Sequence, residues 1–317
     1  MKVLLANDGM SQQGIDLLVK AGFEVNTTRV AQGQLANFIN KNKIIGLLVR
    51  SATKVDRELI DGCPGLRLIG RGGVGMDNID VEHARSKGIH VINTPTASVE
   101  SVAELVMAHL LGASRSLHEA NRTMPLEGDL HFKLLKKNFA NGLELRGRTL
   151  GIIGFGRIGQ ATAKKAIALG MKVVFTDHDP GSRTLELPFY DGRSLSFELE
   201  GTDLDSLLGQ SDFVSLHVPA QAKPLIGKRE LALMRHGAGI VNTSRGGVLD
   251  EKALVEALDT GHIGFAALDV YESEPHPAIK VLMNPKISLS PHIGASTLEA
   301  QGRIGEELAL QIIEILK

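Results

Sequence analysis

The sequence is poor in cysteine and in aromatic residues. Its 317 residues include one cysteine, no tryptophan and two tyrosines. One cysteine cannot form an internal disulfide, so the cysteine content favours a cytoplasmic protein. Cys63 precedes Pro64 and has no basic residue directly beside it. We therefore expect a buried thiol at this position and not a nucleophile.

An excess of charge of one sign is also missing, as are long apolar runs. The 35 Lys and Arg residues nearly balance the 36 Asp and Glu residues, and the formal net charge is -1. This balance argues against nucleic acid or an anionic membrane as a partner. The sequence contains no run approaching the roughly 18 apolar residues of a membrane span, and its first apolar run is too short for a signal peptide. A small molecule is the expected partner.

The length suits two domains, and a hydrophobic content of 43% allows each of them to bury a core. Up to residue 97, short apolar runs alternate with helix-like segments, and the same rhythm restarts at Leu150. Strands that alternate with helices predict parallel sheets. The expected strands are residues 2–6, 44–49, 66–70, 90–93, 150–154, 172–177, 213–218, 239–243, 265–270 and 287–290. The fold class is therefore α/β, with two Rossmann or flavodoxin-like doubly wound sheets.

Other segments interrupt this rhythm. Apolar residues at helical spacing predict a long helix from about residue 98 to 118 and another helix at the end of the sequence. Residues 125–141 are expected to be irregular. The segment between Asp177 and Asp212 contains PFYDG at residues 188–192, which indicates an extra loop or hairpin.

Residues 154–159 (GFGRIG) form a glycine-rich turn between an expected strand and an expected helix. Gly154 would allow a tight turn, Gly156 would let a pyrophosphate approach the backbone, and Gly159 would let the helix pack on the sheet. The helix N-terminus would offer its N–H groups to phosphates. Asp177 ends the next expected strand, where an acid binds the ribose hydroxyls of NAD. A plain structural turn is the alternative, and the agreement of strand, loop, helix and acid favours a dinucleotide.

Three short motifs supply a cation, a carboxylate and an imidazole: residues 243–247 (TSRGG), 273–275 (SEP) and 290–294 (SPHIG). Reduction of a 2-keto acid needs a cation that holds the carboxylate and an acid that protonates the new oxyanion. Taken singly, Arg245 is consistent with an exposed arginine, and Glu274 with a surface acid that has Glu272 as a rival. His292 is one of 11 histidines, most of which are expected to be ordinary surface or core residues.

Together and in this order, these motifs resemble the D-isomer-specific 2-hydroxyacid dehydrogenase family over essentially the whole chain. Residues 49–55 (VRSATKV), 93–95 (NTP) and 294–301 (GASTLEAQ) are most similar to its D-3-phosphoglycerate dehydrogenases. The resemblance implies that Arg245 binds the substrate carboxylate, that His292 is the acid–base residue and that Glu274 orients its imidazole.

The resemblance also implies NAD as the cofactor and assigns further site residues. The expected cofactor-binding residues are Val74, Gly154, Gly156, Arg157, Ile158, Gly159, Asp177, Val218, Thr243 and Asp269. The expected substrate-binding residues are Arg50, which would reach a substrate phosphate, Val74 and Gly75, whose amides would receive the carboxylate, and Arg245. From the residues alone, an exposed arginine at position 50 and a flexible turn at residues 71–75 stay open. No metal is expected, because the sequence has no His, Cys and Asp cluster with zinc-ligand spacing.

The family's architecture implies a discontinuous substrate-binding domain of residues 1–97 and 292–317. Residues 98–291 would form the NAD-binding Rossmann domain, with the active site between the two. The helix near residues 98–118 and the segment after it are expected to pair two copies into a homodimer, with packing inside one domain as the alternative. The sequence ends after one dehydrogenase unit, so a regulatory domain is not expected.

The expected function is the NAD-dependent oxidation of 3-phospho-D-glycerate to 3-phosphohydroxypyruvate, which begins serine biosynthesis. A reductase of glyoxylate, hydroxypyruvate or another small 2-keto acid is the alternative within the family. A third possibility, from another class, is a dinucleotide-sensing corepressor scaffold with the same fold. Glu274 argues against a formate dehydrogenase, which has a glutamine in that place.

Overall fold

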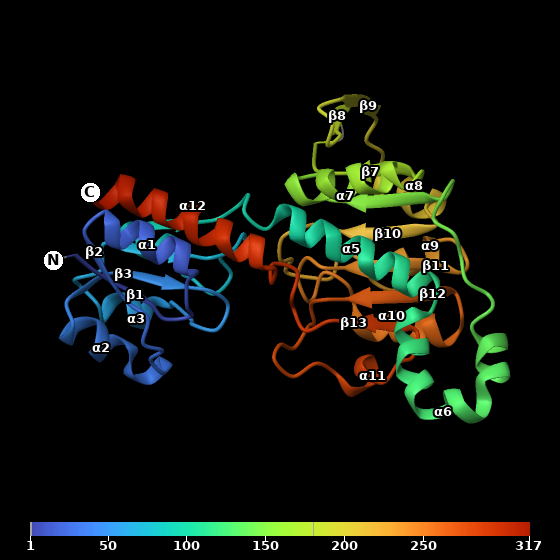
Figure 1. The fold of residues 1–317 in the computed structure, drawn as a ribbon, viewed down its shortest axis with the longest axis horizontal. Coiled ribbons are helices and arrows are strands. Elements are labelled where there is room, and N and C mark those ends of the chain that lie inside the picture. Colours follow the sequence, from blue (N-terminus) through green and yellow to red (C-terminus); the bar gives the residue numbers. More distant parts are fainter. Residues whose placement is uncertain (1, 180) are drawn as a thin grey trace. The chain divides into compact units, whose positions relative to one another are not determined.

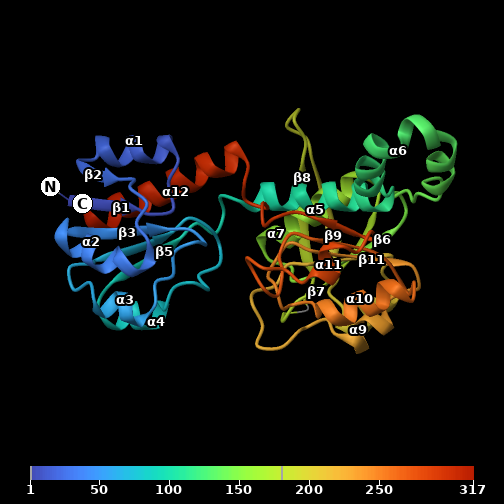
Figure 2. The ribbon, with the colours of Figure 1, turned by 90° about the horizontal axis from the view of Figure 1, so that it is seen from below.

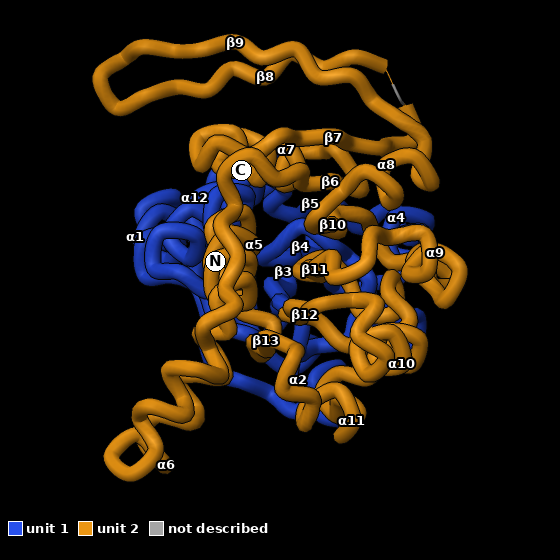
Figure 3. Tube along the Cα trace, turned by 90° about the vertical axis from the view of Figure 1, so that its right-hand side faces the viewer, with its two compact units in different colours: residues 1–101, 295–317 blue, residues 102–294 orange. Residues whose placement is uncertain are grey.

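The structure is a computed structural model that describes residues 2–179 and 181–317. The chain divides into two compact units, residues 1–101 with 295–317 (unit 1) and residues 102–294 (unit 2), which Figure 3 distinguishes by colour. Each unit contains a parallel β-sheet with helices on both faces (Figures 1 and 2). The predicted α/β fold with two doubly wound parallel sheets is confirmed.

The sheet of unit 1 has the strand order β2-β1-β3-β4-β5, and all its strands are parallel. It is buried on both faces, because neighbouring residues of a strand belong to different cores. In β1, Leu4 shares a core with α1 and α12, whereas Leu5 shares one with α2, α3 and α4. The strands are Lys2–Ala6 (β1), Phe23–Asn26 (β2), Ile44–Val49 (β3), Leu68–Arg71 (β4) and His90–Asn93 (β5). The helices are Gln12–Lys20 (α1), Gln32–Gln34 (η1), Leu35–Lys41 (α2), Arg57–Asp61 (α3), Val81–Ser86 (α4) and Leu298–Leu316 (α12).

Two glycines allow α1 and α12 to pack closely. A Cβ atom at Gly14 would lie 2.6 Å from the carbonyl oxygen of Gly305, and one at Gly305 would lie 2.0 Å from Ser11 Oγ. A side chain at either position would push the two helices apart. Segments from opposite ends of the sequence are thereby joined in one unit.

The sheet of unit 2 has the strand order β13-β12-β11-β10-β6-β7, again entirely parallel. One face packs against α5 and α7, and the other against α8, α9 and α10. The strands are Thr149–Ile153 (β6), Lys172–Thr176 (β7), Phe213–Leu216 (β10), Ala238–Asn242 (β11), Ile263–Leu268 (β12) and Ile287–Leu289 (β13). The helices are Val99–Ser114 (α5), Leu117–Asn138 (α6), Arg157–Ala168 (α7), Leu204–Gln210 (α8), Lys228–Leu233 (α9), Glu251–Asp259 (α10) and Ile279–Leu282 (α11).

The extra segment after Asp177 is a hairpin, as expected. Its antiparallel strands are β8 (Arg183–Pro188) and β9 (Ser194–Leu199), and they stand beyond α7 in Figures 1 and 3. Leu185 anchors the hairpin because it is 2% exposed and belongs to the core under α5 and α7. Tyr190 at the tip is fully exposed.

The structure corrects two expectations for the segment between the sheets: the long helix is present but ends earlier, and the segment after it is helical. The helix expected near residues 98–118 ends at Ser114, and Ser116 then takes a positive φ of 48°. Residues 125–138, expected to be irregular, belong to α6, which contains Pro125 and has non-helical backbone angles at His131. Leu135 is the buried residue of this helix, so no apolar periodicity marks it in the sequence. α5, in contrast, buries its apolar face within unit 2.

Candidate active site

The carboxyl ends of β6 and β10 mark the point in unit 2 where the strand order changes direction. β6 lies between β7 and β10, and the chain then continues outward through β11, β12 and β13. Open parallel sheets bind ligands in the crevice at such a point. The glycine loop follows β6, and Val218 lies just after β10, so both lie at this crevice.

The glycine loop has the backbone that its sequence requires. Gly154 has a φ of 90°, and a Cβ atom there would lie 2.4 Å from the carbonyl oxygen of His217. A Cβ atom at Gly159 would lie 2.2 Å from the carbonyl oxygen of Gly154. Gly156 is the N-cap of α7, and a Cβ atom there would meet nothing within 4 Å. The N-terminus of α7, which begins with Arg157 and Ile158, therefore has room for a phosphate group.

Asp177 closes the glycine loop from the end of β7. Its Oδ2 accepts a hydrogen bond from the amide of Phe155 at 2.6 Å, and its Oδ1 accepts one from the amide of His178 at 2.7 Å. Arg183, the nearest arginine in sequence, pairs with Asp179 at 2.6 Å. The acid that would meet the ribose is thus fixed against the loop that would meet the phosphates.

Two polar groups at the same strand ends differ in what they can do. Burial lowers the pKa of His217 to about 4, so this imidazole is neutral at pH 7 and cannot act as a general acid there. Thr243, directly after β11, is 8% exposed, and its Oγ1 has no hydrogen-bond partner among the described residues. A buried hydroxyl without a partner is costly, so a polar ligand group would stabilise it. The glycine loop, Asp177 and Thr243 all fit a dinucleotide.

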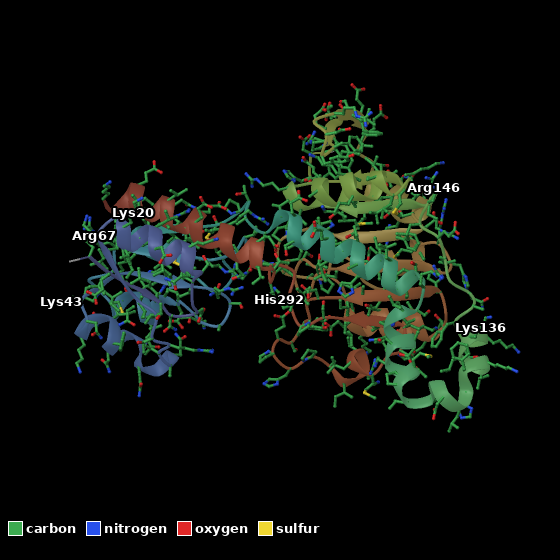
Figure 4. The ribbon with its side chains drawn as sticks, viewed as in Figure 1. Lys20, Lys43, Arg67, Lys136, Arg146 and His292 are labelled. Atoms are coloured by element: carbon green, nitrogen blue, oxygen red, sulfur yellow. The ribbon has the colours of Figure 1, made fainter. Side chains whose placement is uncertain are left out.

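His292 and Glu274 form a hydrogen-bonded pair. His292 lies in the loop after β13 and is labelled in Figure 4. Its Nδ1 is 2.8 Å from Glu274 Oε2, while Glu274 Oε1 accepts a hydrogen bond from the amide of Tyr271 at 3.0 Å. The side chains of His292 and Glu274 are 42% and 37% exposed, so a ligand can reach them. With Nδ1 bound to Glu274, Nε2 is the nitrogen that can exchange a proton with a substrate.

The rival acid, Glu272, has another partner. Its Oε1 accepts a hydrogen bond from the amide of Glu251 at 2.9 Å, and Glu251 Oε1 accepts one from the amide of Glu272 at 2.8 Å. These reciprocal bonds tie the loop of Glu274 to the first residue of α10. The two acids that spacing alone does not separate therefore have different surroundings.

Arg245 lies on a loop that touches the loop of Glu274. A Cβ atom at Gly246 would lie 1.7 Å from the carbonyl oxygen of Tyr271, so only glycine permits this approach. Asn242 shapes the turn, because its Nδ2 donates to the carbonyl of Arg245 and its Oδ1 accepts from the amide of Ser244. The Nη1 of Arg245 donates to the carbonyl of Ser244 at 2.7 Å. The motifs of Arg245, Glu274 and His292 are thus brought together in unit 2.

Asp269 and Tyr271 connect these loops. Asp269 is 1% exposed, and its carboxylate accepts hydrogen bonds from the amides of Ile293 and Gly294. The hydroxyl of Tyr271 donates to the carbonyl of Ser290 at 2.8 Å. Burial, with the charge of Asp269 as a lesser cause, raises the pKa of Tyr271 to about 12, so the phenol keeps its proton. No residue-level signal in the sequence identified Tyr271 as a link.

Arg50, Val74 and Gly75 belong to unit 1, where they follow β3 and β4. Asp8, after β1, accepts hydrogen bonds from the amides of Arg50 at 2.7 Å and Thr53 at 3.0 Å. The carbonyl of Val74 accepts one from Asn93 Nδ2 at 2.6 Å. The strand order of unit 1 changes direction between β1 and β3, so Arg50 lies at the switch point of its own sheet. Asp8 supports the loop of Arg50, and no motif in the sequence marks it for this role.

Arg50 also lines a narrow slot at these strand ends. Its stem lies over Gly72, with Cγ 3.6 Å from where a Cβ atom of that glycine would be. Residues from the first turns of α12 form part of the slot. Its lining includes Gly9, Arg50, Gly72, Gln301 and Ile304.

Comparison with known proteins identifies the family. A model described as D-isomer specific 2-hydroxyacid dehydrogenase, NAD binding domain, matches residues 107–294. The chain belongs to the D-isomer specific 2-hydroxyacid dehydrogenase family. It is therefore a 2-hydroxyacid dehydrogenase with an NAD-binding domain, and that domain lies within unit 2. The expected family and the NAD cofactor are confirmed.

Individual relatives in the family differ in substrate. A hydroxypyruvate reductase of Thermotoga maritima is 43% identical over 317 residues, which cover 98% of this chain and 97% of that protein. A D-3-phosphoglycerate dehydrogenase of Methanocaldococcus jannaschii is 41% identical over 319 residues, covering 100% of this chain but 58% of the relative. The crystal structure of a glyoxylate reductase from Paecilomyes thermophila has a TM-score of 0.82 at 32% identity, with 100% and 96% of the two chains covered.

Two further observations concern residues 2–179 and 181–317. No helix in these ranges is both long and apolar enough to cross a membrane. Within the same ranges, no group of three or more His, Cys, Asp or Glu side chains is arranged to hold a metal ion.

The position of Asp177 predicts which dinucleotide the dehydrogenase prefers. Its carboxylate would repel the 2′-phosphate of NADP, so we expect kcat/KM with NAD to exceed that with NADP at least tenfold, or about 1.4 kcal/mol. Asp177→Asn keeps an acceptor for the amide of Phe155 but loses the charge, and should narrow this ratio. Asp179→Asn is the matched control, because Asp179 is paired with Arg183. Equal kcat/KM for both dinucleotides in the unmodified protein would contradict the prediction.

Proposed function

We propose that the protein is an NAD-dependent dehydrogenase that interconverts 3-phospho-D-glycerate and 3-phosphohydroxypyruvate in serine biosynthesis, in the cytoplasm. The observation that carries the chemistry is the pair of His292 and Glu274, 2.8 Å apart, with the loop of Glu274 touching the loop of Arg245. We also propose that unit 2 binds the dinucleotide and that unit 1 binds the distal part of the substrate.

The residues divide the work of the reaction. The glycine loop and Asp177 would hold NAD, which would supply the acceptor for the hydride of the hydroxyl-bearing carbon. His292 takes the hydroxyl proton on Nε2, and returns it when the reaction runs as a reduction. Glu274 holds the tautomer and orientation of the ring through Nδ1. Arg245 binds the substrate carboxylate and polarises the reacting oxygen through its planar guanidinium.

Substitutions at this group test the reaction type. His292→Ala should lower kcat by about two decades or more, since general acid–base catalysis is typically worth ~10²–10⁴. Arg245→Lys should also be severe, because an ammonium group cannot make the two-point contact with a carboxylate. The measurement is NADH oxidation with 3-phosphohydroxypyruvate, hydroxypyruvate and glyoxylate, together with NADH binding by fluorescence.

The control is His276→Ala, which removes an exposed histidine two positions after Glu274. It should keep kcat within about twofold. Full activity of His292→Ala would remove the acid–base assignment. NADH binding by the unmodified protein without turnover of any of the three acids would favour a dinucleotide-sensing scaffold instead.

The substrate proposal rests on Arg50. A phosphate group accepts charge-assisted hydrogen bonds from a guanidinium. The backbone amide of Arg50 donates to Asp8, which places the residue at the switch point of the unit 1 sheet. A hydroxypyruvate or glyoxylate reductase is the second candidate. It is supported by the Thermotoga maritima relative, which matches nearly the full length of both chains.

Arg50→Ala should separate the two candidates. Loss of a charged contact worth ~1.5–3 kcal/mol should raise KM for 3-phosphohydroxypyruvate by roughly one to two decades. Glyoxylate has no group for this side chain, so its kinetics should barely change. Steady-state kinetics on both acids provides the measurement. An equal response would make Arg50 structural or a carboxylate ligand, and would leave the smaller 2-keto acids as the better candidates.

We further propose that two copies associate through α6. The helix exposes several large apolar side chains, and a cluster of this kind on the surface of a domain marks a protein–protein interface. They are Leu117, Met124, Leu126, Leu130, Phe132 and Leu134, each between 42% and 79% exposed. α6 also extends away from the sheet of unit 2 in Figures 1 and 3.

Analytical ultracentrifugation at micromolar concentration tests this association. The unmodified protein should sediment at twice its chain mass of 34.0 kDa. Leu126→Glu combined with Leu130→Glu should give monomers, because the two side chains are 78% and 79% exposed and would bring charges into the interface. Leu298→Glu, at a leucine of α12 that is 90% exposed, is the matched control and should stay dimeric. Particles of single-chain mass from the unmodified protein would refute the proposal.

A further inference from the structure

A buried carboxylate holds the loop of His292 in place through two hydrogen bonds. Asp269, just after β12, accepts hydrogen bonds from the amide of Ile293 at 2.8 Å and from that of Gly294 at 2.9 Å. A Cβ atom at Gly294 would lie 3.1 Å from Asp269 Oδ2 and 3.3 Å from Val102 Cγ2, so the loop lies tight against both. The two residues that follow His292 are thus fixed to the sheet.

His292 itself has an unfavourable backbone conformation. Its φ is 55°, in the left-handed region that residues with a side chain seldom adopt. Such a conformation persists where the surrounding contacts fix it. The position of the imidazole beside Glu274 therefore depends on what holds the loop.

Asp269 is itself linked by hydrogen bonds to three other buried residues. Ser290 Oγ donates to Asp269 Oδ1 at 2.6 Å. His109, on α5, lies between two hydroxyls, with Nε2 2.9 Å from Ser290 Oγ and Nδ1 2.9 Å from Ser288 Oγ. All four residues are buried, with exposed fractions between 1% and 8%.

The donors and acceptors in this chain have one consistent direction. The hydroxyl hydrogen of Ser290 points to Asp269, so Ser290 Oγ must accept from Nε2–H of His109. In a neutral imidazole Nδ1 then accepts from the hydroxyl of Ser288. Burial lowers the pKa of His109, although the charge of Asp269 opposes this, so the neutral ring fits the site. The chain runs from Ser288 through His109 and Ser290 to Asp269.

We infer that His109 is a positioning residue, which acts through Ser290 and Asp269 to hold residues 290–294 so that His292 stays hydrogen-bonded to Glu274. This inference rests on the proposed acid–base role of His292. A histidine that merely filled the core would leave the loop unchanged when replaced by an apolar residue of fitting size. A positioning residue would not.

We call the hydrogen-bonded residues His109, Ser290 and Asp269 the brace of the His292 loop. Amide hydrogen exchange of the cofactor-free protein tests this brace without reference to activity. His109→Leu and Ser290→Ala should each speed exchange at Ile293 and Gly294 about tenfold, because the carboxylate that protects these amides loses its support. Exchange in residues 154–159 should not change. His109→Gln, which keeps a donor and an acceptor, should retain most of the protection. The control is His262→Leu, which removes an imidazole bonded to the carbonyl of Leu231 at the opposite ends of the strands.

Kinetics tests whether the brace serves His292. His109→Leu should lower kcat roughly three- to thirtyfold with little change in KM for NADH. In a His292→Ala background the same substitution should change kcat less than about twofold, because its effect passes through the missing imidazole. His109→Gln should restore most of the kcat. If His109→Leu does not fold, Ser290→Ala takes its place in both assays.

Two results would overturn the inference. One is unchanged exchange at Ile293 and Gly294 in both His109→Leu and Ser290→Ala. The other is an equal loss of kcat with and without His292. Full activity of His292→Ala would instead count against the proposed function, and the exchange result would still show whether His109 braces the loop.

Discussion

The parallel pairing of all six strands in the sheet of unit 2 is the constraint on which the candidate site depends. Parallel strands end at the same edge of a sheet, so residues that follow successive strands of unit 2 converge although they are far apart in sequence. Closeness then depends on small residues, as at Gly246, where the chain passes against the carbonyl of Tyr271. The loops that converge in this way carry Gly154, Asp177, Val218, Thr243, Asp269 and His292.

The sequence was sufficient for those parts of the fold whose residues show a clear burial pattern. Central strands such as β3 and β10 are buried on both faces and appear as almost continuous apolar runs. β2 was missed because it is a four-residue edge strand in which Phe23 is the buried residue. α6 was missed for a similar reason. Leu135 is its buried residue, so the helix leaves no apolar pattern in the sequence.

The site was predictable where a short motif contains its own chemistry, as in the glycine loop. It was not predictable where a residue's role is set by a distant partner. Spacing could not separate Glu272 from Glu274, because the difference lies in what each meets across the fold: Glu251 in one case and His292 in the other. His109 carries no local signal at all, since its two serine partners lie on β13 and just beyond it.

The order of the chain has a consequence for how the protein folds during synthesis. Unit 2 is continuous in sequence, so it can fold as soon as it has been made. Unit 1 lacks α12 until the whole of unit 2 has been translated. Until then, the face of its sheet that includes Leu4, Leu48 and Leu68 has no helix from that end of the chain to cover it. α1 covers part of this face, and the part that α12 will cover stays exposed in the nascent chain for most of translation.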